Sequence, residues 1–131
     1  MTIPYSHQLE KIEAHYAEKP EDWQEILWEI HEFILASDPR IQPWYKYKTP
    51  FYGIDENICF VNLKADKSCI DIGFLYGPRL EQNYPEANRL LSSKELKMIR
   101  HYKVQLNQWT EKEQEELAYL LDLAIPYSVK S

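Results

Sequence analysis

Residues 44–77 read WYKYKTPFYGIDENICFVNLKADKSCIDIGFLYG, and this stretch decides the fold. Three runs rich in aromatic and β-branched residues, 44–54, 57–65 and 68–77, are separated by polar segments typical of turns. Pro50 favours an edge or bulged position for the first run, because proline cannot donate to a sheet ladder. Consecutive strands joined by short turns predict an antiparallel sheet.

Helices flank the predicted strands on both sides. Leu9, Ile12 and Tyr16 recur at helical spacing and predict a short amphipathic helix. A longer helix is predicted over residues 20–37, with Pro20 at its first position and Asp38 before Pro39 at its end. Its apolar stripe is formed by Trp23, Ile26, Leu27, Ile30, Phe33 and Ile34. The strands are therefore expected to pack against amphipathic helices.

The chain beyond residue 77 completes the pattern. Residues 79–93 predict a short helix and a loop, and residues 97–106 predict a strand with Met98, Tyr102 and Val104 on one side. Thr110 followed by Glu113 forms a capping box that begins a final helix. The prediction is a single α+β domain over residues 1–131, with an antiparallel sheet of about four to five strands. Its N- and C-terminal helices are expected to pack mainly on one face.

Composition narrows the function classes. Fifteen Lys and Arg against 21 Asp and Glu give a net charge of −6, so nucleic acid and anionic membranes are the least expected partners. Residues 7–38 hold nine acidic and two basic residues, net −7, which leaves the remainder near balance. No apolar run approaches the roughly 20 residues that span a bilayer. With no signal-peptide pattern at the start and only two cysteines, we expect a cytoplasmic protein with reduced thiols.

Short motifs in the central stretch resemble those of the YdhG-like domain family, a family of unknown function. The family's aromatic-Lys-aromatic strand followed by proline and an aromatic residue is matched by Tyr45, Lys46, Tyr47, Pro50 and Phe51. Its later strand positions are matched by Cys59, Gly73, Phe74 and Gly77. The sequence MIRHYKV at 98–104 is similar to the family's basic strand before the last helix. The likeness covers nearly the whole chain in element order.

The resemblance implies a small cytosolic α+β domain with a fold similar to frataxin, and it implies iron handling for some members. A glycine- and lysine-rich turn that is common before the basic strand is absent, and LLSSKELK stands there instead. A shared fold does not transfer a function, which has to be argued from a site.

The first candidate site lies on the predicted strand 44–54. Alternation places Trp44, Lys46 and Lys48 on one face and Tyr45, Tyr47 and Thr49 on the other. Lysines beside an aromatic face suit a planar ligand, a peptide or a second subunit. The alternative is structural: the tyrosines pack under the helices while the lysine stems cover Trp44.

The second candidate is the acidic face of the long helix. Carboxylates there lie one turn apart and are hard oxygen ligands of the kind that iron(II) accepts. The residues concerned are Glu21, Asp22, Glu25 and Glu29. Carboxylates on one straight helix cannot surround an ion, so any iron would bind weakly. The alternative is a solvated face that keeps the protein in solution.

Catalytic signatures are absent from the sequence. Three glycines are too few for a phosphate-binding loop, no Gly-x-Ser-x-Gly elbow occurs, and the histidines lack metal-ligand spacing. Asp71 lies inside an apolar strand, either on a solvated face or as a buried acid. Trp28 and Leu35 lie off the main helical stripe, where they either pack against the first helix or form a self-association patch.

The sequence therefore predicts a non-enzymatic binding or adaptor domain with no cofactor. Its site would be the sheet face around Trp44, Lys46 and Lys48, and its partner a small molecule or a protein. It would exist as a monomer or a homodimer. The competing hypothesis is a frataxin-like iron chaperone that uses the acidic helix.

Overall fold

A computed structural model describes residues 5–92 and 98–130 of the 131-residue chain. Its elements, in chain order, are α1 (Tyr5–Ala17), α2 (Glu21–Ala36), β1 (Gln42–Lys46), β2 (Thr49–Gly53), β3 (Asn57–Leu63), β4 (Ile70–Phe74), α3 (Gly77–Asn83), the 3-10 helix η1 (Pro85–Arg89), β5 (Arg100–Val104) and α4 (Glu111–Ser128). Within these residues, no helix is long and apolar enough to cross a membrane.

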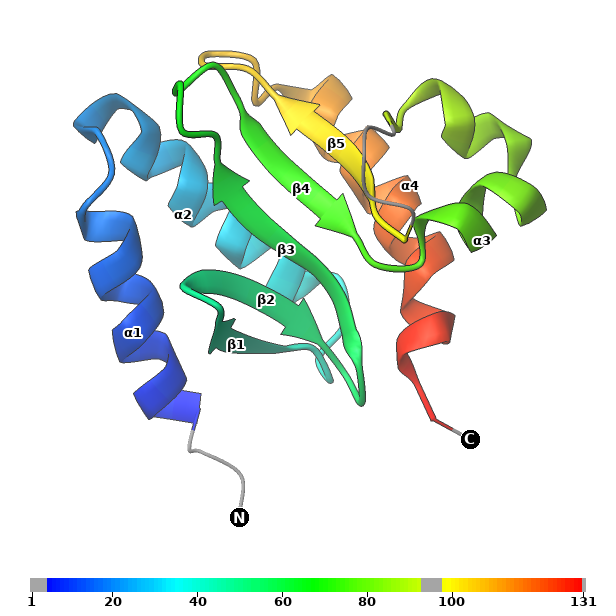
Figure 1. The fold of residues 1–131 in the computed structure, drawn as a ribbon, viewed down its shortest axis with the longest axis horizontal. Coiled ribbons are helices and arrows are strands. Elements are labelled where there is room, and N and C mark those ends of the chain that lie inside the picture. The colour runs from blue at the N-terminus through cyan, green and yellow to red at the C-terminus, as the bar shows by residue number, and fades with distance from the viewer. Residues whose placement is uncertain (1–4, 93–97, 131) are drawn as a thin grey trace.

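The five strands form one antiparallel sheet in the order β1-β2-β3-β4-β5. Figure 1 shows α2 and α4 behind one face of this sheet and α1 along its β1 side. We call the face behind which α2 and α4 lie the covered face. No described helix crosses the other face, which is turned toward the viewer and which we call the open face. The predicted α+β architecture is confirmed.

The core lies between the covered face and the helices. Alternate residues of β4, namely Ile70, Ile72 and Phe74, are fully buried against α2 and α4. Each such side chain contributes about 1.5–3 kcal/mol through the apolar area it removes from water. Both cysteines, Cys59 and Cys69, are buried free thiols, as the sequence predicts.

The helix ends follow local chemistry. Pro20 precedes α2 with extended backbone angles (φ −55°, ψ 143°), so it is the residue before the helix and not its first member. The capping box of Thr110 and Glu113 begins α4 as predicted. Met98 lies outside β5 and is 66% exposed, so its predicted place beside Tyr102 is wrong.

The prediction of one strand over residues 44–54 is also wrong. Residues 42–53 form a hairpin, in which Lys46 of β1 pairs with Thr49 of β2 across a two-residue turn. Tyr47 and Lys48 form that turn with φ of 54° and 57°. Positive φ at both central positions is the requirement of a type I′ turn, which normally carries Asn or Gly. Lys48 therefore belongs to the turn and not to the strand face of Trp44 and Lys46.

Both edges of the sheet are protected against further strands. Hydrogen-bonded pairs alternate along an antiparallel ladder, so Pro43 and Tyr45 direct their backbone groups away from β2. Pro43 has no N–H, and the Tyr45 N–H donates to the Gln8 side chain of α1 at 2.7 Å. At the β5 edge, Ser92 and His101 exchange two backbone hydrogen bonds of 2.9 and 2.8 Å. Proline and covering segments are the usual means of closing an edge.

Candidate functional site

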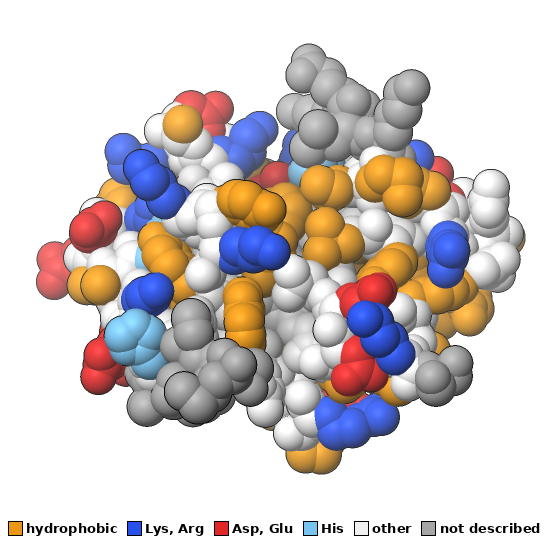
Figure 2. Space-filling view, turned by 60° about the horizontal axis from the view of Figure 1, so that its bottom comes forward, with side chains coloured by type: hydrophobic (Ala, Val, Ile, Leu, Met, Phe, Trp, Pro, Cys, Tyr) orange, Lys and Arg blue, Asp and Glu red, His pale blue; other side chains and the backbone are white. Residues whose placement is uncertain are grey.

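A row of aromatic side chains crosses the open face. Trp44 of β1 pairs with Phe51 of β2, and Phe51 pairs with Phe60 of β3, so the three rings share one face. All three are partly buried, and the Phe51 and Phe60 ring centroids are 5.5 Å apart. Figure 2 shows hydrophobic side chains at the surface near the middle of its view, with Lys or Arg side chains beside them. We call these three residues the aromatic row.

Gly73 lets the last ring of the row lie flat on the sheet. Phe60 pairs directly with Gly73 of β4. A Cβ atom placed on Gly73 would lie 2.2–2.8 Å from three atoms of the Phe60 ring, closer than real contacts allow. The ring thus occupies the space that a side chain at residue 73 would take. Such a cross-strand aromatic over a glycine recovers contact area that the glycine lacks.

A parallel row of polar side chains lies one step further along the strands, on the same face. The strand pairing places Lys46 opposite Thr49, and it places Asp71 between Asn62 and Lys103. Among the described residues, neither Lys46 nor Lys103 forms an ion pair. We call these five residues the polar row.

Asp71 is the acid of the polar row, and its partner is a histidine on β5. His101 pairs with Gly73 on β5, and its Nδ1 donates to Asp71 Oδ1 at 2.8 Å. The two side chains are 11% and 14% exposed respectively. The sequence left open whether Asp71 is solvated or buried. It lies on the open face, but its side chain is mostly buried and hydrogen-bonded to His101.

A cavity of about 290 Å³ lies along the open side of β1, and we call it the Trp44 cavity. Gln42, Trp44 and Lys46 form its β1 wall, and residues 53–57 of the β2–β3 turn form the other. The two carboxylates at the turn end already have partners. Asp55 accepts from the Lys130 backbone N–H at 2.7 Å, and Glu56 accepts from the Tyr76 hydroxyl at 2.5 Å. Neither of these donors is a cation, so both carboxylates keep their charge, and the Lys46 ammonium lies at the other end of the cavity.

The covered face holds a different set of aromatic residues. The Tyr52 hydroxyl lies 2.8 Å from the Tyr16 hydroxyl and 2.8 Å from His31 Nδ1, and all three side chains are buried. Burial lowers the pKa of His31 to about 4 and raises that of Tyr16. His31 is neutral at pH 7, and we call these three residues the buried network.

The sequence left open whether the tyrosines of residues 44–54 pack under the helices, and the structure gives a different answer for each of the two. Tyr45 is half-buried, and its hydroxyl lies 3.2 Å from His15 of α1, so it packs under a helix. Tyr47 is 79% exposed at the hairpin turn, so it does not. Trp28 packs edge-on against Tyr16 at 5.2 Å between ring centroids, which supports the interpretation that α1 covers it.

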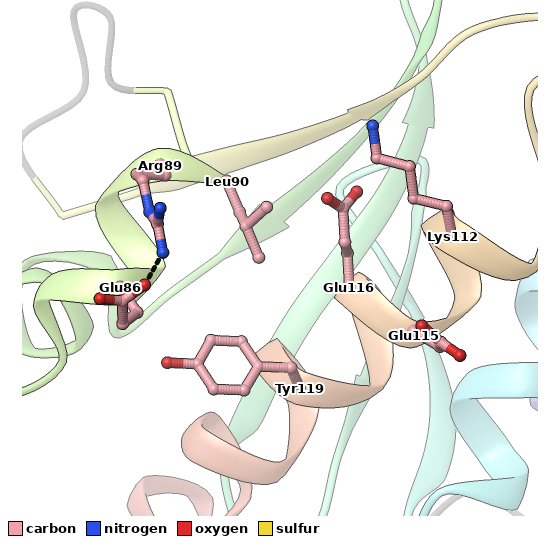
Figure 3. A pocket seen from close by; sticks show the side chains of 7 residues that line it. All are labelled: Glu86, Arg89, Leu90, Lys112, Glu115, Glu116 and Tyr119. Carbon is pink, nitrogen blue, oxygen red and sulfur yellow. Dashed lines mark ion pairs between the residues drawn. The ribbon is translucent and has the colours of Figure 1, made fainter.

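A larger cavity of about 590 Å³ lies between η1 and α4, which sequence reasoning missed because no motif marks it. Figure 3 shows Tyr119 and Leu90 pointing into it, with Glu116 beside them. Glu116 accepts from the Tyr102 hydroxyl at 2.8 Å, which adds to burial in raising the pKa of Tyr102. Arg89 is paired with Glu86. Two further charged residues, Lys112 and Glu115, also line the cavity.

The acidic helix face is where the sequence places it. Its four carboxylate residues, Glu21, Asp22, Glu25 and Glu29, are all exposed on α2. In residues 5–92 and 98–130, no group of three His, Cys, Asp or Glu side chains is close enough to hold a metal ion. No observation favours the iron hypothesis, and we do not propose it.

The fold and the face described above define an α+β domain: an antiparallel five-stranded sheet with helices on one side and an open aromatic face. Residues 12–118 match the family described as domain of unknown function DUF5655, and the chain belongs to that family. No match was found among the curated proteins.

A solved structure with a similar fold is that of YdhG from Bacillus subtilis, a protein of the DUF1801 family. It shares 11% sequence identity with this chain and superposes with a TM-score of 0.61 over 88% of each chain. The resemblance to YdhG-like domains is therefore confirmed as a likeness of fold.

Proposed function

We propose that this protein is a binding module for a planar aromatic anion, held on the open face at the Trp44 cavity. The observation that carries the proposal is the alignment of an aromatic row with a polar row on a face that no described helix covers. Packing in the core does not account for the aromatic row, because no described helix covers it.

The two rows divide the work of recognition. A planar ligand stacks on the aromatic row, and stacking of a ring on an aromatic side chain contributes about 1–3 kcal/mol. Polar groups at its edge then meet the hydroxyl and amide of Thr49 and Asn62. A small number of placed polar groups beside an apolar surface is the usual composition of a small-molecule site.

Charge selects an anion. The chain carries −6 overall, yet Lys46 and Lys103 lie on the open face and Lys48 lies at the hairpin turn beside it. Asp71 is the one acidic residue of the polar row, and it accepts a hydrogen bond from His101. Local positive charge on an acidic protein favours an anionic partner at close range.

The test uses 8-anilinonaphthalene-1-sulfonate, a sulfonate with a planar naphthalene ring, whose fluorescence rises on binding. We expect saturable binding to the folded protein, weaker binding of uncharged 2-naphthol, and at least a tenfold loss of sulfonate affinity in Trp44→Thr and Phe51→Thr. Tyr119→Ser, in the η1–α4 cavity, is the matched control and keeps wild-type affinity. Circular dichroism confirms that each variant is folded.

The proposal fails if the wild-type protein does not bind the sulfonate, or if Tyr119→Ser loses affinity while Trp44→Thr and Phe51→Thr retain it. Binding that appears only above the temperature at which the protein begins to unfold also counts against it, because the dye then reports exposed core.

A further inference from the structure

The hairpin turn of Tyr47 and Lys48 adopts a conformation that its residues disfavour. Both have φ in the left-handed region, at 54° and 57°. For a bulky aromatic residue and a long basic one this is an outlier, because Cβ crowds the backbone there. Asn followed by Gly would form the same turn without that strain.

Contacts within the protein do little to offset the strain. The Tyr47 side chain is 79% exposed, and its hydroxyl has no hydrogen-bond partner among the described residues. Its ring lies edge-on to Phe51 at 6.3 Å between centroids, and the Lys46 ammonium lies 5.3 Å from its centre. The hairpin requires this backbone conformation but not these residue types, and residues that disfavour their own backbone conformation point to a role outside folding.

The turn between β3 and β4 also holds a lysine in the left-handed region and serves as a comparison. Lys67 has φ of 58°, close to the values at the hairpin turn. Its N–H donates to the Lys64 carbonyl at 2.8 Å, and Asp66 accepts from the Ser68 backbone at 3.0 Å and from its hydroxyl. Lys67 thus sits in a turn closed by its own neighbours, away from the aromatic row.

We propose that the hairpin tip, residues 46–48, is the second wall of the ligand site. The Tyr47 ring closes over the ligand that lies on Trp44 and Phe51, and Lys46 and Lys48 bind its anionic group. The inference rests on the proposed function and extends it by orienting the ligand. Its ring lies in the Trp44 cavity, and its carboxylate, sulfonate or phosphate points toward the tip.

The acidic end of the cavity agrees with this orientation. Asp55 and Glu56 lie at the β2–β3 turn, whereas Lys46 lies at the end nearest the tip. A ligand with an aromatic ring and an anionic group would therefore be repelled at one end of the cavity and held at the other. An aryl carboxylate, sulfonate or phosphate has this polarity.

The decisive variant is Tyr47→Asn combined with Lys48→Gly, which keeps the turn and removes both the strain and the two side chains. We expect its thermal midpoint to rise by about 4 °C, because residues suited to the left-handed region replace strained ones. We also expect its affinity for 8-anilinonaphthalene-1-sulfonate to fall at least tenfold. The single variant Lys48→Gly is expected to lose affinity for the sulfonate but not for 2-naphthol.

Lys67→Gly is the matched control, since it removes a lysine in the left-handed region and leaves the aromatic row unchanged. Its sulfonate affinity is expected to equal that of the wild-type protein. The inference is overturned, and the proposed function kept, if the double variant binds as tightly as the wild type while Phe51→Thr does not. A double variant that is no more stable than the wild type also overturns it, because the turn is then not strained. A wild-type protein that does not bind the sulfonate overturns both proposals.

Discussion

Phe51 and Tyr52 are neighbours in β2 and lie on opposite faces of the sheet, and their surroundings differ in kind. Tyr52 is fully buried, and its hydroxyl is within hydrogen-bonding distance of two other side chains. Phe51 is partly buried on the open face, where its ring lies near those of Tyr47 and Phe60. The covered face uses its aromatic residues to complete a core, whereas the open face leaves its rings accessible.

This contrast predicts a separation of stability from binding. Changes in the buried network should weaken the fold and leave the open face unaltered. Changes in the aromatic row should weaken binding and leave the fold nearly as stable. The predictions below test whether stability and binding depend on different faces, and failure of any one of them would count against this.

The largest effect is expected from acid. Burial lowers the pKa of His31 to about 4 in the folded protein, against about 6.5 when unfolded. Its contribution is fully present above pH 6.5, and it is lost as the pH falls toward 4, because the unfolded state binds a proton that the folded state does not. The loss approaches about 3 kcal/mol at pH 4. Urea unfolding at pH 7.5, 6 and 4.5 measures it.

His31→Gln removes that titration, so its stability should fall less steeply between pH 7 and pH 4.5 than that of the wild type. His7→Gln changes an exposed histidine of α1 and should follow the wild-type curve. Equal slopes for wild type and His31→Gln would show that the buried network does not set the acid response.

The second prediction compares the two neighbours directly. Tyr52→Phe removes the hydroxyl that meets both Tyr16 and His31, and leaving buried polar groups without a partner costs about 2 kcal/mol. Phe51→Thr removes a partly buried ring from a strand position that threonine tolerates, and should cost less than about 1 kcal/mol. Urea unfolding of the two variants at pH 7.5 gives both values. Equal losses would erase the distinction between the two faces.

The smallest effect concerns Gly73. Replacement by Ala forces the Phe60 ring aside, and since that ring is the end of a movable side chain, we expect a loss of about 1 kcal/mol. In a Phe60→Leu background the same replacement should be neutral or slightly stabilising, because glycine is unfavourable within a strand. A double-mutant cycle by urea unfolding measures the coupling. Absence of coupling would mean that the ring does not lie over Gly73 in solution.

The sequence was informative where local pattern decides structure. The helical stripe of α2, the capping box of α4 and the β3–β4 hairpin were all predicted from spacing and turn residues. The basic residues Lys94 and Lys97 near the predicted fourth strand lie outside the described residues. Trp44 and Lys46 lie together beside a cavity, and ligand binding there stays a prediction.

Tertiary pairing decided what the sequence could not. The β1–β2 hairpin was missed because its turn, Tyr47 and Lys48, carries none of the Gly, Asn or Asp signals that mark such turns. The contact between His101 and Asp71 joins strands 30 residues apart, and no local pattern specifies such a partner. The run of alternating aromatic and lysine residues did mark this segment as unusual, but the same pattern fits one continuous strand.

The closed edges of the sheet have a consequence for how the domain can be handled. Gln8 of α1 caps the Tyr45 N–H, so α1 acts as the boundary of the sheet as well as part of its core. A chain shortened from the N-terminus through α1 would expose a bare strand with a free donor, and such strands recruit copies of themselves. A tag or fusion on this domain is therefore safer placed ahead of an intact α1 than as its replacement. We therefore expect loss of α1 to promote aggregation through the exposed edge of β1.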